Sequence, residues 1–165
     1  MVKKMFGYFA LPLLLLLGNN SGNAAPPAGD SKLANLSTRA FVSTDDDVVI
    51  AGFLLSGGRS DNRMVVRGIG PSLAAVGLTD VLADPILELR DTNGALILAN
   101  NDWQDNPDQA AEISEAGLAP TDGLESALVG TLPPGLYTAL LAGLNNGTGI
   151  GVVEIYDRGA APPGP

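Results

Sequence analysis

The chain has 165 residues, 18 of them acidic and 9 basic, and it contains neither histidine nor cysteine. These absences exclude serine–histidine–aspartate and cysteine–histidine nucleophiles, zinc sites with histidine or cysteine ligands, and disulfides. The net charge of −9 has the wrong sign for holding a phosphate backbone, so we expect no nucleic-acid partner.

The first residues have the pattern of a secretory signal peptide. Lys3 and Lys4 precede an apolar run over residues 5–17, which is shorter than the roughly 20 residues that a membrane-spanning helix needs. Small residues at 22 and 24 predict cleavage after Ala24; an uncleaved membrane anchor is the alternative. We therefore expect a secreted protein, periplasmic, cell-surface or extracellular, with no membrane contact once residues 1–24 are removed.

Proline and glycine mark the limits of the predicted domain. Residues 25–32 read as a linker and residues 159–165 as a flexible tail, because proline lacks the N–H that a strand ladder needs. One domain over residues 33–158 remains between them, long enough to bury an aliphatic core.

Short apolar runs separated by turn residues follow one another along this domain. We predict strands at residues 36–42, 48–55, 64–69, 86–90, 95–99, 126–132, 136–143 and 149–156. Asn93-Gly94 is the clearest hairpin turn, because both residues tolerate positive φ. Residues 107–116 predict a short helix with Pro107 in its first turn, and residues 72–76 a single turn. The pattern predicts an all-β fold, an antiparallel, jelly-roll-like β-sandwich of about eight strands with one short helix.

Several of these stretches occur in a familiar order. They include Val-Val-Arg-Gly-Ile-Gly-Pro-Ser-Leu at 65–73, Leu-Pro-Pro-Gly-Leu-Tyr-Thr at 132–138 and Val-Glu-Ile-Tyr-Asp at 153–157. Together they resemble a module of secreted and cell-surface proteins of environmental bacteria, and the second half is similar to the pre-peptidase C-terminal type of β-sandwich. The resemblance spans residues 33–157 and implies an accessory or surface role without catalysis.

An oxygen-rich loop precedes the predicted helix. Its carboxylates recur every third residue, with amide side chains between them, and Ca²⁺ prefers six to eight such hard oxygen ligands. The candidate calcium ligands are Asp102, Asp105 and Asp108, with amides from Asn100, Asn101 and Asn106. The alternative is that this loop caps the helix, whose N-terminal end favours acids. We expect no cofactor other than this calcium ion.

Two further features suggest contacts with a cation or a ligand. Asp45, Asp46 and Asp47 form a run that would attract a cation, although a solvated turn explains it more simply. Trp103 lies between polar residues and is the best candidate for an exposed sugar-stacking ring, whereas Tyr137 and Tyr156 suit the core.

Arg67 falls within an apolar strand and shares a face with Val65 and Ile69. Because an unpaired guanidinium there would be costly, we predict a structural ion pair with a carboxylate such as Asp84 or Glu125; binding of an anionic ligand is the alternative. Arg39 invites the same interpretation.

Three other polar side chains are interpreted as structural. Ser72 follows Gly70-Pro71 and is expected to cap a turn, because no histidine is present to activate it. Glu88 and Glu154 should point away from the core, because their strand neighbours are apolar.

These features predict a non-enzymatic secreted or cell-surface module with a structural, adhesive or interaction role. Its partner would be an extracellular protein or polysaccharide. The alternative is an extracellular carbohydrate-binding module, assisted by calcium, that uses Trp103. A hydrolase with two carboxylates is a third class, which composition does not exclude.

Overall fold

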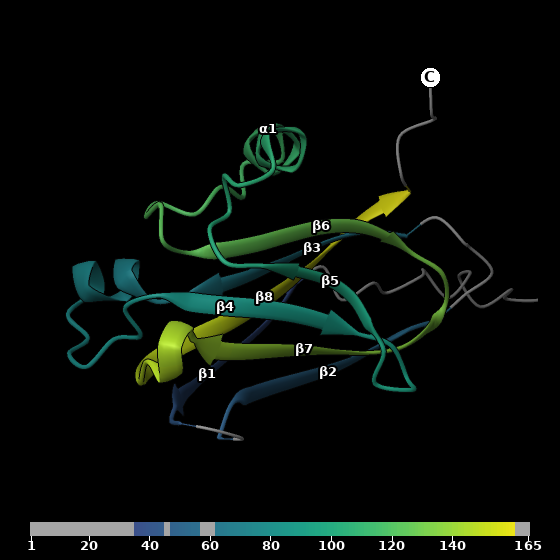
Figure 1. The fold of residues 1–165 in the computed structure, drawn as a ribbon. Helices are drawn as coiled ribbons and strands as arrows, with labels where there is room; N and C mark the ends of the chain where they lie inside the picture. Colours follow the sequence, from purple (N-terminus) through teal and green to yellow (C-terminus); the bar gives the residue numbers. More distant parts are fainter. Residues whose placement is uncertain (1–34, 45–46, 57–61, 161–165) are drawn as a thin grey trace, which may run out of the picture. The chain divides into compact units, whose positions relative to one another are not determined.

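The computed structural model has eight strands in two four-stranded antiparallel sheets (Figure 1). It describes residues 35–44, 47–56 and 62–160. The predicted leader and linker and residues 161–165 lie outside the described residues. Within the described part, no helix is long and apolar enough to span a bilayer. The prediction of an antiparallel sandwich of about eight strands with one short helix is confirmed.

Most consecutive strands of the chain belong to different sheets. Sheet A has the order β1 (Asn35–Val42), β8 (Gly149–Ala160), β3 (Asn62–Ile69), β6 (Ser126–Leu132). Sheet B has the order β2 (Val49–Leu55), β7 (Gly135–Gly143), β4 (Pro85–Arg90), β5 (Leu96–Asn100). The remaining elements are the 3-10 turns η1 (Pro71–Val76) and η2 (Leu144–Asn146) and the helix α1 (Pro107–Glu115).

The main core lies between the sheets and is almost wholly aliphatic. Strand β4 shows the alternation expected of a strand with one buried face. Leu87 and Leu89 are buried, and Glu88 and Arg90 alternate with them on the other face. One aromatic pair contributes, with the rings of Phe53 and Tyr137 stacked at 5.5 Å between centroids. A core of this kind needs no disulfide, consistent with the absence of cysteine.

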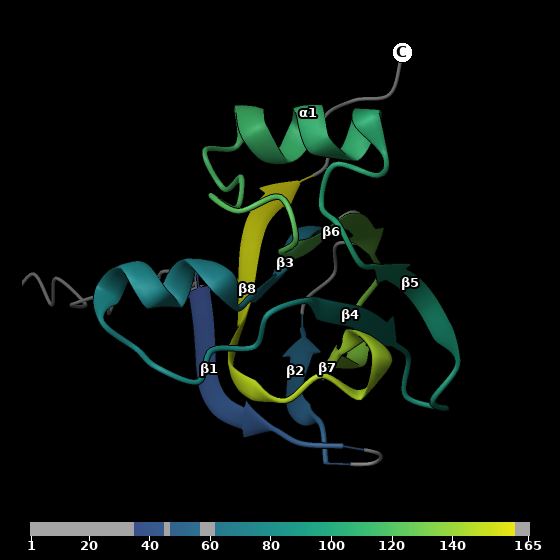
Figure 2. The same ribbon diagram turned by 60° about the vertical axis from the view of Figure 1, so that its left-hand side comes forward.

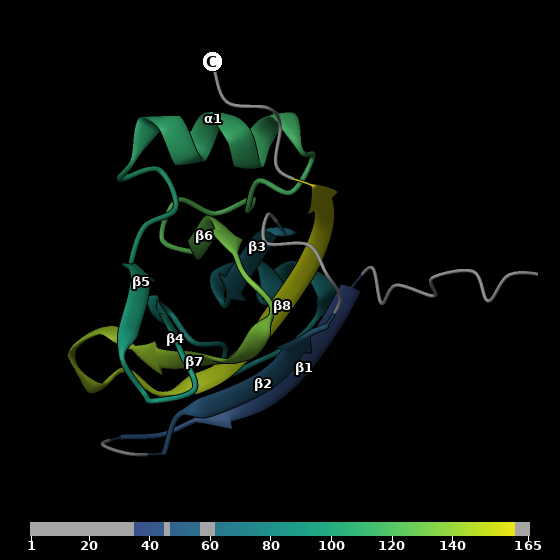
Figure 3. The same cartoon turned by 90° about the vertical axis from the view of Figure 1, so that its right-hand side faces the viewer.

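A second, smaller apolar cluster lies on the outer face of sheet A. Helix α1 inserts Ile113, which is fully buried, against Val65 of β3 and Val129 of β6. Figures 2 and 3 show α1 next to β3, β6 and β8, on the side away from β4 and β7. Because β3 is buried on both faces, it is apolar at the consecutive positions Met64, Val65 and Val66, with Arg63 and Arg67 on either side of this stretch.

The last strand extends further than its sequence predicts. The tail was expected to begin at residue 159, but β8 continues to Ala160, which lies opposite Asn62 of β3. A register shift in the β3–β8 ladder and the positive φ of Gly159 (81°) accompany this extension. The pairing with β3, a tertiary contact, therefore overrides the local turn signal of glycine.

Close approach of Leu141, on sheet B, requires glycine at two positions of sheet A. A Cβ on Gly68 would lie 2.6 Å from Cδ1 of Leu141 and would also meet Oγ of Ser126. A Cβ on Gly151 would lie 2.7 Å from Cδ2 of the same leucine. Leu141 is fully buried, so it has little room to move aside.

Gly68→Ala should therefore overpack the core and lower the free energy of unfolding by about 1–3 kcal/mol, as measured by urea denaturation. The matched control is Gly123→Ala, where an added Cβ meets no atom within 4 Å and φ is not positive. Equal stabilities of the two variants would contradict this account of the packing.

Candidate functional site

The acidic loop before α1 serves mainly to begin the helix. The Asn106 side chain accepts hydrogen bonds from the backbone N–H groups of Asp108 and Gln109, both at 3.1 Å. Asp105 and Asp108 are exposed, and Asp108 lies in the first helical turn, where a negative charge is favourable. In residues 35–44, 47–56 and 62–160, no group of three or more acidic side chains is arranged to hold a metal ion. The structure therefore does not assemble Asp102, Asp105 and Asp108 into one site.

Asp102 instead lies near Asp84, the residue just before β4. Burial and, to a lesser extent, the charge of Asp102 raise the pKa of Asp84 above its usual value. The Oδ1 atoms of Asp84, Asn101 and Asp102 are buried without a hydrogen-bond partner among the described residues. Asp84 and Asp102 are both carboxylates, and Asn101, next to Asp102 in the chain, has an amide oxygen; oxygens of these kinds suit a hard cation better than an anion.

Trp103 is part of the packing around α1. Its indole N–H donates to the backbone oxygen of Asp122 at 3.1 Å, and its backbone N–H donates to the backbone oxygen of Glu125 at 2.9 Å. The ring is half-buried and packs against the cluster that contains Ile113. Through these two hydrogen bonds, Trp103 joins the loop before β6 to the segment that follows β5.

Arg67 forms an ion pair with Glu154, not with Asp84 or Glu125 as predicted. Its Nε donates to Oε2 of Glu154 at 2.8 Å, its Nη1 to the backbone oxygen of Leu118 at 2.9 Å, and its guanidinium lies 5.4 Å from the ring centre of Tyr156. The β3–β8 register places Arg67 directly opposite Glu154. Glu154 does point away from the core, but it is paired rather than solvated.

The other predicted charged residues form no such network. Arg39 is exposed on β1 opposite Val152, and no ion pair joins it to another residue of the described ranges. Asp45 and Asp46 lie outside the described residues. Asp47 is exposed, and its backbone oxygen accepts a hydrogen bond from Ser43 N at 2.8 Å.

Glu125 is the polar residue whose role the sequence does not reveal. Its side chain is fully buried, and Oε1 accepts three hydrogen bonds, from Gly70 N (3.1 Å), Ser72 N (3.0 Å) and Ser72 Oγ (2.5 Å). These bonds hold the start of η1 against the start of β6. Ser72 is thus a structural donor, but it does not cap the turn as predicted, because its hydroxyl donates to an acceptor 53 residues further along the chain.

A second ion pair joins sheet A to α1. Arg63 Nε donates to Oε1 of Glu112 at 2.6 Å, and Arg63 Nη1 donates to Oγ1 of Thr131 at 3.0 Å. The hydrogen bonds from Arg63 hold the pKa of Glu112 below its usual value, although partial burial opposes this.

Among the described residues, no helix lies on the outer face of sheet B, and this face carries several exposed apolar side chains. Strand pairing aligns Ile50 with Leu140 and Leu54 with Leu136, and Gly52 with Thr138 lies between these pairs. Ile50, Leu54 and Leu136 are 62%, 64% and 56% exposed. We call this surface the apolar face of sheet B and define it by Ile50, Gly52, Leu54, Leu96, Leu136, Thr138 and Leu140.

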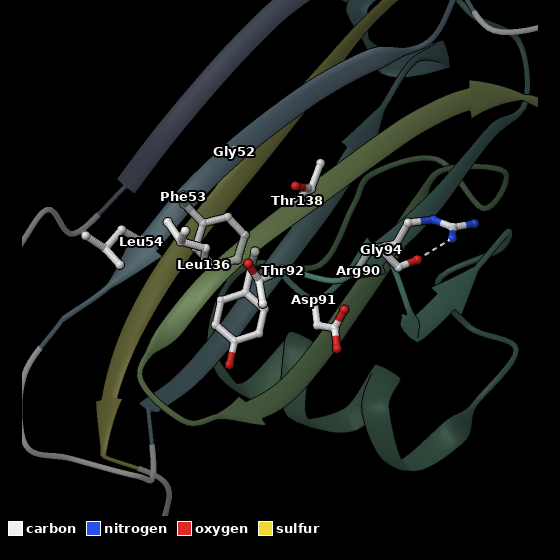
Figure 4. A pocket seen from close by; sticks show the side chains of 10 residues that line it. Gly52, Phe53, Leu54, Arg90, Asp91, Thr92, Gly94, Leu136 and Thr138 are labelled. Atoms are coloured by element: carbon white, nitrogen blue, oxygen red, sulfur yellow. Dashed lines mark hydrogen bonds between the residues drawn. The ribbon is translucent and has the colours of Figure 1, made fainter.

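A hollow of about 670 Å³ lies at one end of this face (Figure 4). Leu54 and Leu136 lie on one side of it, and Arg90, Asp91 and Thr92 lie on the other. Arg90 Nη1 donates to the backbone oxygen of Gly94 at 2.8 Å, which fixes the β4–β5 hairpin beside the hollow. Neither Asp105 nor Trp103, nor any other residue singled out for binding in the sequence, lines this hollow.

A comparison with protein-family models finds no match, and a comparison with curated proteins finds none that is similar. The resemblance to the pre-peptidase C-terminal type of sandwich therefore stays a prediction.

Glu112→Gln should destabilise the fold by about 0.2–1 kcal/mol at pH 7, because it removes a partly exposed ion pair. The folded-state pKa of Glu112 is depressed, so this stabilisation is present above the unfolded-state pKa and is lost as pH falls through the folded-state pKa. Chemical denaturation at pH 7 and pH 3 should show the difference from wild type shrinking at pH 3. Glu115→Gln, on the exposed end of the same helix, is the control; a deficit equal at both pH values would refute the ion-pair explanation.

Proposed function

We propose that this chain is a non-enzymatic interaction module, secreted or on the cell surface, that binds another protein through the apolar face of sheet B. The observation that carries the proposal is the difference between the two outer faces of the sandwich. Helix α1 covers part of the outer face of sheet A, whereas leucine and isoleucine side chains on sheet B are more than half exposed. A contiguous exposed apolar patch of this kind is typical of an interaction surface.

The described carboxylates support a role without catalysis. Glu88, Glu112 and Glu154 each have an arginine partner, and Glu125 is buried against η1. A hydrolase with two carboxylates needs both acids free and facing one cleft. Asp91 is the single acidic residue lining the hollow beside the apolar face of sheet B, so that hollow offers no such pair.

The composition of the face favours a protein partner over a polysaccharide. Sugar-binding platforms usually present aromatic rings, but the large exposed side chains here are aliphatic. Tyr137, which lines the hollow, is only 7% exposed, and its hydroxyl donates to the backbone oxygen of Pro133 at 2.7 Å. Aliphatic side chains fit the apolar core of a protein interface.

A photo-activated cross-linking residue at position 136 should give a discrete protein adduct in cells that produce the full-length chain. The matched control is position 76, because Val76 is equally apolar and 76% exposed but lies on η1, outside the apolar face of sheet B. The measurement is a gel of the irradiated cells probed for this chain. Adducts absent at 136, or equally strong at 76, would contradict the proposal.

We propose, second, that a calcium ion binds at the corner formed by Asp84, Asn101 and Asp102. The supporting observation is that these side chains have buried oxygens without partners and that one carboxylate raises the pKa of the other. A cation between them would remove this repulsion and supply the missing partners. Asp105 and Asp108, which the sequence also suggested, take no part in this version.

The variant Asp84→Asn distinguishes a corner that holds a calcium ion from a corner that holds none. In EDTA the variant should be more stable than wild type at neutral pH, because a buried charge and its repulsion with Asp102 are removed. Since the folded-state pKa of Asp84 is raised, wild type loses stability as pH rises through that pKa, and the advantage of the variant should vanish in acid.

In millimolar Ca²⁺ the order should reverse. A site filled at about 100 times its Kd adds roughly 2.7 kcal/mol to wild type, or on the order of 10 °C in Tm, and the variant should lose this shift. Asp105→Asn is the control and should keep it. If the Tm of wild type is the same in Ca²⁺ and in EDTA, the calcium proposal is wrong.

A further inference from the structure

We infer that the partner of the apolar face of sheet B is a second copy of this chain, which binds in a twofold, face-to-face dimer. The inference rests on the proposed function and names the partner of the same surface. In a twofold dimer the same patch of both copies meets itself, so the patch must be compatible with itself in both charge and shape.

Charge favours this face over the rest of the surface. The chain carries a net charge of −9, so two copies repel each other wherever their acidic surfaces meet. On the outer face of sheet B the charged strand residues are Glu88 and Arg90, which neutralise each other through a hydrogen bond of 2.9 Å from Arg90 Nε to Glu88 Oε2. The strands of two such faces can therefore approach without net repulsion, and their glutamate–arginine pairs can also attract each other across a twofold axis. Asp91, in the hairpin beside the hollow, is a further charge, and its Oδ1 accepts hydrogen bonds from the backbone N–H groups of Asn93 and Ala95.

Shape points the same way, because the face holds both projections and a depression. Leu54 and Leu136 project beside the hollow, and both are more than half exposed. Gly52 leaves the neighbouring space open, since a Cβ there would have only one atom within 4 Å, the backbone oxygen of Tyr137 at 3.9 Å. Under a twofold axis the leucines of one copy can enter the hollow of the other, and the reverse contact occurs at the same time.

The other large exposed apolar side chains do not form a comparable surface. Phe41, Val76 and Leu124 lie on β1, on η1 and in the loop before β6, outside the strands of sheet B. The remaining one, Ile97, lies on β5 of sheet B and is 38% exposed. The apolar face of sheet B instead gathers its residues on paired strands, as the β2–β7 register shows. Burial of this face against a second copy therefore removes several exposed leucine and isoleucine side chains from water together.

Sedimentation velocity tests the inference with protein purified from expression of the full-length chain. Protein concentrations of about 1–200 µM suit the affinity expected of a small interface. Wild type should sediment increasingly as a dimer across this range. Gly52→Val fills the hollow without touching the core, so it should retain the fold by circular dichroism and weaken dimerisation at least tenfold. Leu136→Glu should do the same by placing a charge on the neutral face. Val76→Glu adds an equal charge elsewhere and should leave the dimer unchanged.

A wild-type protein that remains monomeric throughout, or a dimer insensitive to both Gly52→Val and Leu136→Glu, would overturn the inference. The cross-linking experiment separates this failure from that of the proposed function. An adduct at position 136 with twice the mass of the chain supports the dimer. An adduct of another mass overturns the dimer but retains a protein partner, and the absence of any adduct overturns both.

Discussion

The packing of α1 onto sheet A is the contact on which the rest of the arrangement depends. A sandwich has two outer faces, and here Ile113 buries part of one of them against Val65 and Val129. The pair Arg63–Glu112 and the indole hydrogen bond of Trp103 hold the helix and its following loop in place. β3 therefore has apolar contacts on both sides, with Val65 next to α1 and with Met64 and Val66 in the core between the sheets. The apolar side chains on the outside of sheet B are left as the distinctive surface of the protein.

The charged residues follow from the same arrangement. Strand pairing brings Arg67 opposite Glu154, and Arg90 lies two residues from Glu88 on one face of β4. The buried carboxylate of Glu125 has no arginine but receives three donors from the Gly70–Ser72 turn. These acids are therefore engaged in joining elements to each other. The corner at Asp84 and Asp102 differs, because two carboxylates repel each other there and each has a buried Oδ1 without a partner among the described residues, so a cation would stabilise it.

Much of the fold was predictable because it is encoded locally. The strand periods, the Asn93-Gly94 turn and Pro107 at the start of α1 act within a few residues of chain, and the structure has them close to their predicted places. Errors occurred where distant segments compete with local signals. Gly159 reads as the start of a tail, yet pairing with β3 continues β8 to Ala160. For the loop of Asp102, Asp105 and Asp108, the sequence indicated a role in capping the helix, which the structure has, but not the effect of Asp102 on Asp84.

The sequence by itself determined the class of the fold, the excluded chemistries and the need for a carboxylate beside Arg67, because these depend on composition, period and the cost of an unpaired charge. Only the tertiary structure decided that this carboxylate is Glu154, that Glu125 receives Ser72, and that α1 covers sheet A rather than sheet B. The physical reason is that strand order and sheet packing join residues 50 to 90 positions apart. No local propensity specifies such pairings; they follow from burying the whole apolar surface at once.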